Sequence, residues 1–451
     1  MIWTMIKSYF KQAWTIIRQN KLFSSIYVIG TAIAIAITMT LFVIYYVKVA
    51  PIYPEYNRLK TMKSISINME IFAKGDDGKE NKIGEFHSDG INQNFITDVL
   101  ANIENVDACT AINSDWTSYL KTDNDKNHFE KVIIKYTDPG FWKVFNFEFL
   151  DGRPFLNEDM TNAPESAIIT SRLAKVLFAS TEATGRKIEI NKKSYNIIGV
   201  IKSPSAFTSD SYADVFIPLT IPKDQPFSLM YASGAFKIIF TAKEQKHVND
   251  ILADINGTLN RMQAEDRDAF NNGTGGEYRF EMTDFIVKPF WKTQLENDTS
   301  TGSVMETVSR LMLLVFSLLI VPAINLSSMI SSRMAERKAE FGIRFAFGAT
   351  KSSVMKQILW ENMLLTTIGG ILGLLLTWLL ICTGAEWVLT IFDQGELLTG
   401  TEKELNADML INPYIFTTTF LVCLAINIIS ALMPAHWALK HTIAESINSK
   451  K

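Results

Sequence analysis

The chain has 451 residues, 47% of them apolar, and a formal net charge of −3. This composition excludes a disordered chain and one that binds nucleic acid through strong positive charge. The three cysteines, Cys109, Cys382 and Cys423, fit neither a disulfide framework nor a zinc site. The five histidines are widely scattered, so we expect no metal cluster.

Four long and almost uncharged stretches set the class of the protein. Each has roughly the 20 apolar residues that cross a bilayer core, and they predict transmembrane helices over residues 22–47, 311–331, 361–385 and 412–433. Small residues in the first stretch also allow a cleaved signal peptide. Its uncharged run and its leader are both too long for one, so we interpret it as a span.

The orientation follows from the charges beside the spans. The leader, residues 1–21, has basic residues and no acidic residue. The loop 332–360 has six lysines and arginines, whereas the loop 386–411 is acidic. The positive-inside rule therefore puts the leader, the loop 332–360 and the tail 434–451 in the cytoplasm. The leader has apolar residues at helical spacing and predicts a helix in the membrane interface, or a plain continuation of the first span.

Residues 48–310 then form one large extracytoplasmic α+β domain between the first two spans. Apolar alternation predicts strands, and three-and-four spacing predicts helices. The predicted strands are 61–72, 128–137, 192–204, 234–242 and 278–291, and the predicted helices are 91–106 and 247–263. Residues 166–179 are predicted as a strand that leads into a helix. We expect one subdomain built from both ends of this segment, with a second subdomain inserted at about 110–220.

No motif in this outer domain indicates an enzyme. It has no nucleophile motif, no HExxH and no glycine-rich phosphate loop. The acids Asp76, Asp77, Glu158 and Asp159 occur in turn-like contexts and are interpreted as solvated.

The stretch ERKAEFGIRFAFGAT, residues 336–350, is dense in charge, glycine and phenylalanine between two spans. Glu340 and Arg344 are four residues apart, acid first, which stabilises a helix. Gly348 is suited to end that helix in a left-handed conformation, and Thr350 to cap the next one, which continues into the third span.

The apolar residues of this short helix divide between two sides. Phe341, Phe345 and Ala349 fall on one side, and Ile343 and Phe347 on another. A rigid elbow of this kind suits docking into a groove of a cytoplasmic partner. A passive helix on the membrane surface is the alternative that the residues leave open.

The stretch from Ser331 to Trp378 resembles the signature of the FtsX-like, MacB-type ABC transporter permeases. The matching residues are Glu340, Gly342, Ile343, Arg344, Ala346, Gly348, Ala349, Thr350, Glu361, Gly369, Gly370 and Gly373. DPGFWKVFNFEFLDGRPF, SAIITSRLAKVLFAS and GRKIEINKKSYNIIGVIKS resemble the family's periplasmic core, so the likeness extends over nearly the whole chain. Two departures concern the cytoplasmic surface: Ile443 or Ala444 stands where a proline is usual, and Phe345 where a basic residue is frequent.

The resemblance implies a coupling helix at about Ala335–Phe347 that contacts an ABC ATPase subunit. The implied ATPase-coupling residues are Arg337, Glu340, Phe341, Gly342, Arg344, Phe345 and Gly348, with Glu340 and Arg344 as polar contacts and Phe341 and Phe345 as packing knobs. No G-x-x-x-x-G-K-[ST] occurs, so ATP hydrolysis would belong to a separate polypeptide, and we expect no cofactor on this chain.

The family also implies a second permease chain, identical or paralogous. Gly369, Gly370 and Gly373 would allow the transmembrane helices of the two chains to approach closely, or would merely give local flexibility. A periplasmic adaptor and an outer-membrane channel are further possible partners, and the inner membrane is the implied location.

The function implied is transmission of ATPase-driven motion to the outer domains. The spans contain almost no ionisable residues, which argues against a hydrophilic conduit. The substrate would then be handled on the outer face or drawn from the membrane, as with antimicrobial peptides, drugs or other amphiphiles. Lipoprotein release, and a non-transporting signalling or scaffold role, remain as alternatives.

Overall fold

The computed structural model describes residues 21–296 and 338–392 and scattered residues elsewhere. The gaps inside the first range are 76–77, 114–115, 122–128, 163–164, 206–207, 220–226 and 275–276, and the scattered residues are 14, 332 and parts of 305–317 and 417–432. The chain forms two compact units. The membrane unit comprises residues 1–45, 308–388 and 407–451, and the outer unit comprises residues 46–307 and 389–406.

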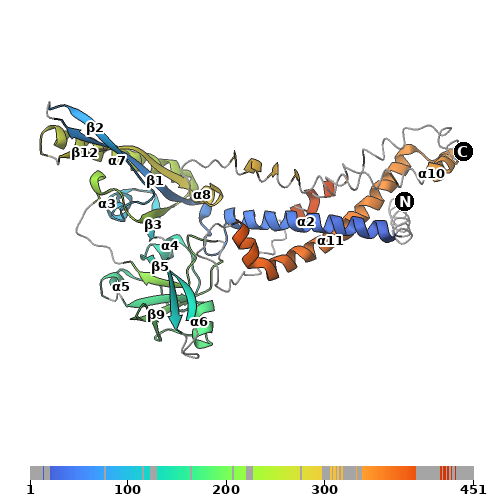
Figure 1. Cartoon of the computed structure of the whole chain (residues 1–451), viewed down its shortest axis with the longest axis horizontal. Coiled ribbons are helices and arrows are strands. Elements are labelled where there is room, and N and C mark those ends of the chain that lie inside the picture. The colour runs from blue at the N-terminus through green and yellow to red at the C-terminus, as the bar shows by residue number, and fades with distance from the viewer. Residues whose placement is uncertain are drawn as a thin grey trace. The chain divides into compact units, whose positions relative to one another are not determined.

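Two helices of the described residues are long and apolar enough to cross a membrane. The candidate spans are Ser24–Val43 within helix α2 (Lys21–Val49) and Lys351–Leu380 within helix α11 (Lys351–Phe392), both labelled in Figure 1. They correspond to the predicted first and third spans. The predicted second span and the predicted helix over residues 1–21 fall almost entirely outside the described residues, and only scattered residues between 417 and 432 of the predicted fourth span are described.

Helix α11 is longer than the span predicted over 361–385. It begins at Lys351, directly after Thr350, and continues to Phe392, into the stretch predicted as a short outer loop. No proline interrupts it, and its glycines are tolerated inside a membrane helix because neighbouring helices compensate for them.

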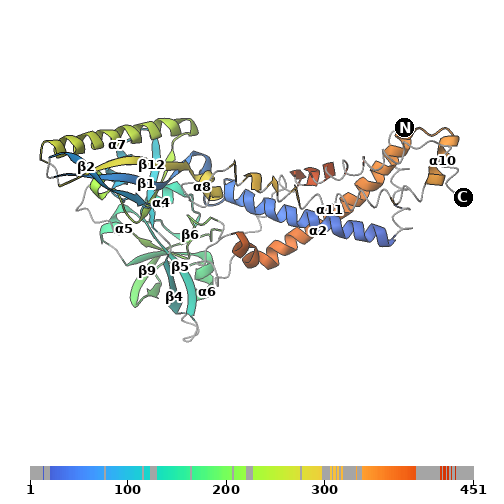
Figure 2. The same cartoon turned by 45° about the horizontal axis from the view of Figure 1, so that its top comes forward.

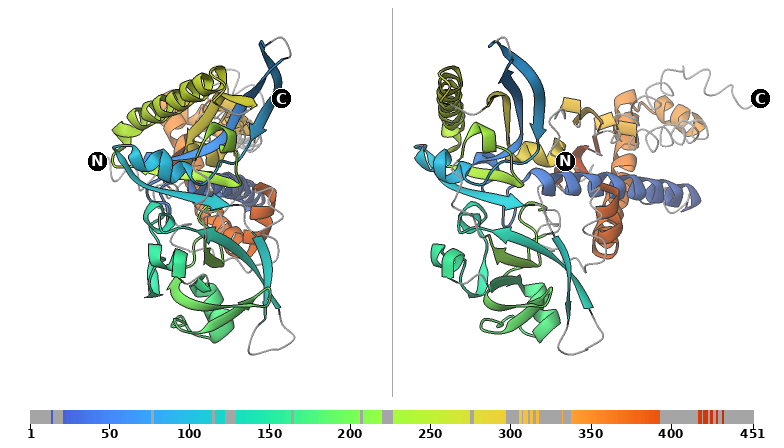
Figure 3. Two further views of the ribbon diagram at one scale, coloured as in Figure 1. Left: turned by 90° about the vertical axis from the view of Figure 1, so that its left-hand side faces the viewer. Right: turned by 60° about the vertical axis from the view of Figure 1, so that its left-hand side comes forward.

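The outer unit contains a first sheet of five antiparallel strands in the order β12-β1-β11-β3, with β2 also paired to β1. The strands are β1 (Thr61–Lys74), β2 (Glu80–Ser88), β3 (Val106–Asn113), β11 (Phe236–Ala242) and β12 (Tyr278–Pro289). Residues 61–63 at the start of β1 pair with β11 and residues 67–74 pair with β2, forming the β1–β2 hairpin, which is blue in Figure 3. Strand β12 pairs with β1 along nearly its whole length.

Helix α7 (Val248–Asn271) covers one face of this sheet, as Figure 2 shows. Its apolar residues Ile251, Ile255 and Leu259 recur every four positions and are fully buried against the sheet. Short helices complete the unit around the sheet. They are α3 (Phe95–Asp98), α8 (Phe290–Glu296), and the 3-10 turns η1 (Arg58–Lys60), η2 (Leu100–Asn102), η3 (Leu229–Tyr231) and η4 (Gln245–His247).

A second, mixed sheet has the order β4-β5-β10-β7-β9-β6, with β8 paired to β9. Its strands are β4 (Trp116–Lys121), β5 (Phe129–Thr137), β6 (Phe149–Gly152), β7 (Ser166–Thr170), β8 (Lys187–Ile190), β9 (Lys193–Ile201) and β10 (Val215–Pro218). Helices α4 (Phe141–Val144), α5 (Asn157–Asn162) and α6 (Ser171–Phe178) belong to the same subdomain. These strands are continuous in sequence and lie between β3 and β11 of the first sheet, within the 110–220 range proposed for an insertion.

Most of the predicted outer-domain elements are confirmed, but the helix predicted over 91–106 is wrong. The structure has only the short α3 and η2 there, and Val106 begins strand β3, where it pairs with Ala242. Phe95, Val99 and Leu100 are still buried, so the apolar spacing is used by two tight turns and not by one helix.

One glycine sets the close contact between the two subdomains near α4, beside an aromatic cluster that lies inside the second subdomain. Phe141 and Trp142 pack with each other and with Phe147 and Phe216, at ring-centroid distances of 5.2–5.7 Å. Just before them, Gly140 lies so close to β3 that a Cβ atom there would overlap the Cys109 carbonyl oxygen. Only glycine allows this approach of the second subdomain to the first sheet.

We therefore expect Gly140→Ala to destabilise the protein by at least about 2 kcal/mol, because the overlap is with backbone and must be relieved by moving the chain. Gly84→Ala is the matched control, since no atom lies within 4 Å of the place that its new methyl group would occupy. Thermal unfolding of the two variants in detergent measures the difference. Equal melting temperatures would contradict the close approach.

Candidate functional site

Helix α10 (Lys338–Ala346) ends in the way that its sequence predicts. Gly348 has a φ of +90°, the left-handed conformation that favours glycine. The Gly348 N–H donates to the Phe345 carbonyl and the Ala349 N–H to the Arg344 carbonyl, both at 3.0 Å. This pair of bonds is a Schellman motif, so the end of α10 is a defined turn.

Helix α11 begins at Lys351, directly after the turn that ends α10. The Ser353 N–H donates to the Thr350 side-chain oxygen at 3.2 Å, so Thr350 is the N-cap that the sequence predicts. The two helices are thus joined by a connection in which Gly348 terminates one and Thr350 starts the other. We call α10, this connection and the first turns of α11 the elbow.

The Arg344 guanidinium holds the elbow together. One of its nitrogens donates to Glu340 Oε1 at 2.6 Å on α10, and the other donates to Gln357 Oε1 at 2.5 Å on α11. Gln357 in turn donates to Glu361 Oε1 at 3.2 Å, and both residues are buried. A planar guanidinium with two fixed donors sets the angle between the helices better than a single point charge would.

The two side chains that the family resemblance implies as polar contacts to an ATPase therefore form hydrogen bonds within this chain. The Glu340–Arg344 pair forms at the predicted spacing, but Arg344 also binds α11, which gives it a positioning role in the elbow. Gln357 was not predicted, because its contact depends on how α10 folds back onto α11. Whether Glu340 and Arg344 also contact a partner stays a prediction.

The apolar side chains of the elbow differ in exposure. Phe347 is 88% exposed and Ile343 60% exposed, and they stand four residues apart. Gly342 is buried and Phe345 is half-buried. The most prominent apolar side chains are therefore Ile343 and Phe347 and not Phe345. Arg337 lies outside the described residues, as does the side chain of Phe341.

The glycines of α11 face other helices of the same unit. A Cβ on Gly369 would lie 3.0 Å from Thr31 Cβ, and one on Gly373 would lie 2.9 Å from the Ala32 carbonyl oxygen, both on α2. A Cβ on Gly370 would overlap the Phe420 ring. Contact with a second permease chain stays a prediction, and in the structure the space beside each glycine is filled from within the chain.

Hydroxyl groups add polar contacts between α2 and α11. Tyr27 and Thr366 share a hydrogen bond of 2.7 Å between their hydroxyl oxygens, and Thr377 donates to the Ala36 carbonyl at 3.3 Å. Small residues and hydroxyl bonds are the usual means by which helices associate in a membrane, where apolar burial gives no advantage over lipid. The glycines and these hydroxyls join the elbow's long helix to α2.

The acids interpreted as solvated turn residues divide in the structure. Glu158 is exposed, and Asp76 and Asp77 lie outside the described residues. Asp159 corrects the interpretation, because it is buried, accepts from Arg153 at 2.6 Å and caps the Leu156 N–H at 2.7 Å. The Arg153 hydrogen bond holds the pKa of Asp159 below its usual range. Within the described residues no group of three or more His, Cys, Asp or Glu is placed to hold a metal.

Two family models match the chain in the order that this fold requires. The MacB-like periplasmic core domain matches residues 24–258, and the FtsX-like permease C-terminal domain matches residues 312–443. The chain belongs to the MacB-like, FtsX-like family of ABC transporter permeases. The elbow lies inside the FtsX-like match and the two outer sheets lie mostly inside the MacB-like match.

Curated relatives are distant in sequence. The chain is 24% identical over 243 residues to the uncharacterized ABC transporter permease YknZ of Bacillus subtilis, covering 54% of this chain and 55% of the relative. It is 25% identical over 360 residues to the macrolide export ATP-binding/permease protein MacB of Hahella chejuensis, covering 73% of this chain and 51% of the relative. The pyoverdine export ATP-binding/permease protein PvdT of Pseudomonas syringae pv. syringae is 25% identical over 244 residues, covering 53% and 34%. The matches span about a third to about half of these relatives.

Solved structures of similar domains superpose only loosely. The extracellular domain of the ABC-type transporter YknZ from Gram-positive bacteria has a TM-score of 0.28 at 14% identity, covering 48% of this chain and 100% of that one. The periplasmic region of MacB from Actinobacillus actinomycetemcomitans has a TM-score of 0.30 at 15% identity, covering 52% and 94%. The family assignment rests on the sequence models and not on these superpositions.

We expect Arg344→Lys to loosen α10, because lysine has a single donor nitrogen and cannot reproduce the two separate nitrogens that the guanidinium places on Glu340 and Gln357. A helix of nine residues is marginal without such a tether. Losing about 1 kcal/mol would speed amide hydrogen exchange in residues 340–347 roughly fivefold, as measured by mass spectrometry. Arg261→Lys on α7, where the arginine donates to its near neighbour Thr258, is the control. Unchanged protection of α10 would show that Arg344 does not fix the elbow.

Proposed function

We propose that this chain is the permease subunit of an ABC transporter, and that it transmits ATPase-driven motion across the inner membrane to a periplasmic domain. The observation that carries the proposal is the elbow. It combines an exposed apolar pair with a hydrogen-bonded connection to a helix long enough to cross the membrane.

The elbow has the two properties that a coupling element needs. Ile343 and Phe347 are exposed apolar side chains on one helix, and such a pair fits a groove on a partner protein. Arg344 and the Schellman turn hold α10 at one angle to α11, so a displacement of α10 is passed to α11 instead of being absorbed at the connection. In this proposal Ile343 and Phe347 insert into the ATPase, while Arg344 and Gln357 fix the elbow.

ATP would be bound and hydrolysed by the ATPase subunit, since this sequence has no phosphate-binding glycine loop. A second permease chain would complete the transporter. Within each chain, Gly369 and Gly373 let α2 and α11 pack closely, and Gly370 leaves room for the Phe420 ring. The N- and C-termini would lie in the cytoplasm and the outer unit in the periplasm.

The substrate class we propose is an amphiphile exported from the outer face or the membrane, such as an antimicrobial peptide or a drug. Residues 22–47 and 362–385 contain no Asp, Glu, Lys, Arg or His, which disfavours a polar path through the spans. Two relatives are named for macrolide export and pyoverdine export, which is compatible with this class.

The test is recovery of an ATPase with the permease purified from native membranes. The double variant Ile343→Asp/Phe347→Asp should recover at least about tenfold less ATPase than the intact chain, because it puts two charges into an apolar contact. Permease-stimulated ATP turnover should fall in parallel. Ile83→Asp, which alters an exposed apolar residue on β2 of the outer unit, should leave both unchanged. If the double variant recovers as much ATPase as the intact chain, these residues are not the contact.

A further inference from the structure

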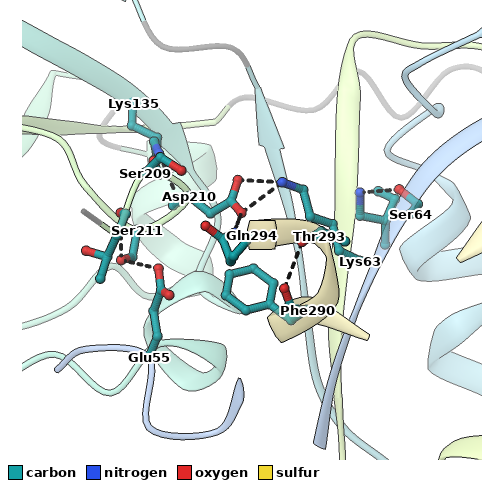
Figure 4. Close-up of polar contacts among 12 residues, drawn as sticks. Glu55, Lys63, Ser64, Lys135, Ser209, Asp210, Ser211, Phe290, Thr293 and Gln294 are labelled. Carbon is teal, nitrogen blue, oxygen red and sulfur yellow. Dashed lines mark hydrogen bonds and ion pairs between the residues drawn. The ribbon is translucent and has the colours of Figure 1, made fainter. Parts of the chain in front are cut away.

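A buried polar cluster ties the second subdomain of the outer unit to the chain segments that enter and leave this unit. Its centre is Asp210, which lies in the junction loop, residues 208–214, between β9 and β10. Asp210 accepts from Lys63 Nζ with both carboxylate oxygens at 2.8 Å, and from Gln294 Nε2 at 2.8 Å (Figure 4). Lys63 is on β1, at the start of the outer unit, and Gln294 is on α8, near its end.

The next residue of the loop holds the entering segment directly. Ser211 Oγ donates to Glu55 Oε1 at 2.6 Å, and Arg58 Nε donates to Glu55 Oε2 at 2.7 Å. Arg58 Nη1 also donates to the Ala50 carbonyl at 2.9 Å, and Ala50 directly follows helix α2. The side chains of Asp210 and Ser211 therefore contact both chain segments through which the outer unit is joined to the predicted first and second spans.

The junction loop is itself held in one conformation. Lys135 Nζ donates to the carbonyls of Ser209 at 3.0 Å and Asp210 at 2.7 Å. At the other end of the loop, Asp214 accepts from Arg172 at 2.8 Å and from the Ile133 N–H at 2.9 Å. Loops are normally exposed, but apart from Ser209 every residue of this loop is buried.

The burial of these charged groups fixes the relative positions of the joined segments more than it stabilises the fold. Lys63 and Arg58 are each 1% exposed and Glu55 is 2% exposed, and apolar residues of similar size would usually stabilise such a place at least as well. Burial alone would raise the pKa of Asp210, but the Lys63 ammonium, helped by Lys135 and Lys237, holds that pKa below its usual range. Asp210 is therefore ionised at neutral pH, and its bonds to Lys63 and Gln294 have fixed directions that apolar contacts lack.

We propose that Asp210 is a positioning residue that holds the second subdomain in a fixed position relative to the entering segment at β1 and the leaving segment at α8. A displacement of the spans would then be transmitted to this subdomain and not absorbed between them. The proposal rests on the proposed function for its use in transport. Other contacts also join the two subdomains, among them those of Asp138, which accepts from Thr110 Oγ1 at 2.8 Å and from the Ala111 N–H at 3.1 Å on β3. Asp210 adds the bonds to β1 and α8, so without it we expect the position of the second subdomain relative to these two segments to vary.

The test measures how rigidly the second subdomain is held. Spin labels are attached at Leu59→Cys and Lys187→Cys, both exposed, in a full-length chain carrying Cys109→Ala, Cys382→Ala and Cys423→Ala. Pulsed electron resonance should give one narrow distance peak for this chain. Asp210→Asn should broaden the peak at least twofold, because the amide has no charge for Lys63 and puts an N–H₂ donor where one carboxylate oxygen accepted a hydrogen bond.

Two further variants distinguish loss of the Asp210 contacts from a general loss of stability. Asp159→Asn breaks an ion pair between a buried aspartate and the half-exposed Arg153 inside the second subdomain, away from the junction loop, and should leave the peak narrow. Gln294→Ala removes one neutral hydrogen bond to Asp210 and should broaden the peak less than Asp210→Asn, which keeps the test valid if Asp210→Asn fails to fold.

A peak that stays narrow in both Asp210→Asn and Gln294→Ala would overturn the proposal, as would equal broadening by Asp159→Asn. Permease-stimulated ATP turnover is measured on the same variants and should stay within twofold of the intact chain, since the junction is distant in sequence from the elbow. The distance measurement needs no ATPase. A failure of the proposed function would appear as absent stimulation of ATP turnover by the intact chain, and the distance measurement would still test the role of Asp210.

Discussion

The contact of the Arg344 guanidinium with Glu340 and Gln357 is the interaction on which the elbow depends. A helix of nine residues has little stability of its own, and an exposed apolar pair on such a helix would be poorly oriented if the helix moved freely. The guanidinium binds the helix to α11 at 2.5 Å and to its own preceding turn at 2.6 Å. Because α11 then continues as a single helix to Phe392, the orientation of Ile343 and Phe347 is linked to a membrane-spanning element.

The junction around Asp210 uses the same physical device in the outer unit. In both places a charged group with several directed hydrogen bonds joins elements that are far apart in sequence or that meet at a turn. Such groups cost desolvation free energy and give geometric definition in return. A protein whose task is to pass displacement from one element to another needs that definition more than it needs extra stability.

Much of this organisation was predictable from the sequence, and the reasons are local. Gly348 and Thr350 act through their own backbone and side-chain preferences, so the end of α10 and the start of α11 were predicted correctly. Uncharged length predicted α2 and α11, and alternation predicted β1, β5, β9 and β11. The two halves of the first sheet could also be grouped, because strand patterns lie on both sides of a long intervening segment.

The contacts that could not be predicted from the sequence are those between residues far apart along the chain. TSDSYAD, residues 208–214, has the composition of an exposed turn, and only the packing of β1, α8 and the segment around Glu55 against it makes Asp210 a buried centre. The helix predicted over 91–106 failed for a similar reason, because pairing with β11 draws Val106 into a strand. Gln357 is one polar residue among several on α11 until α10 folds back to bring Arg344 to it.

The most direct test of the central claim, that the elbow docks on an ATPase, is photocrosslinking in native membranes from a benzoyl-phenylalanine placed at position 347. The account predicts a crosslinked product with a polypeptide that carries a phosphate-binding G-x-x-x-x-G-K-[ST] loop, and no such product from the same probe at Leu379, an exposed apolar position within α11. Products with lipid alone from position 347 would contradict it and would make α10 a membrane-surface helix.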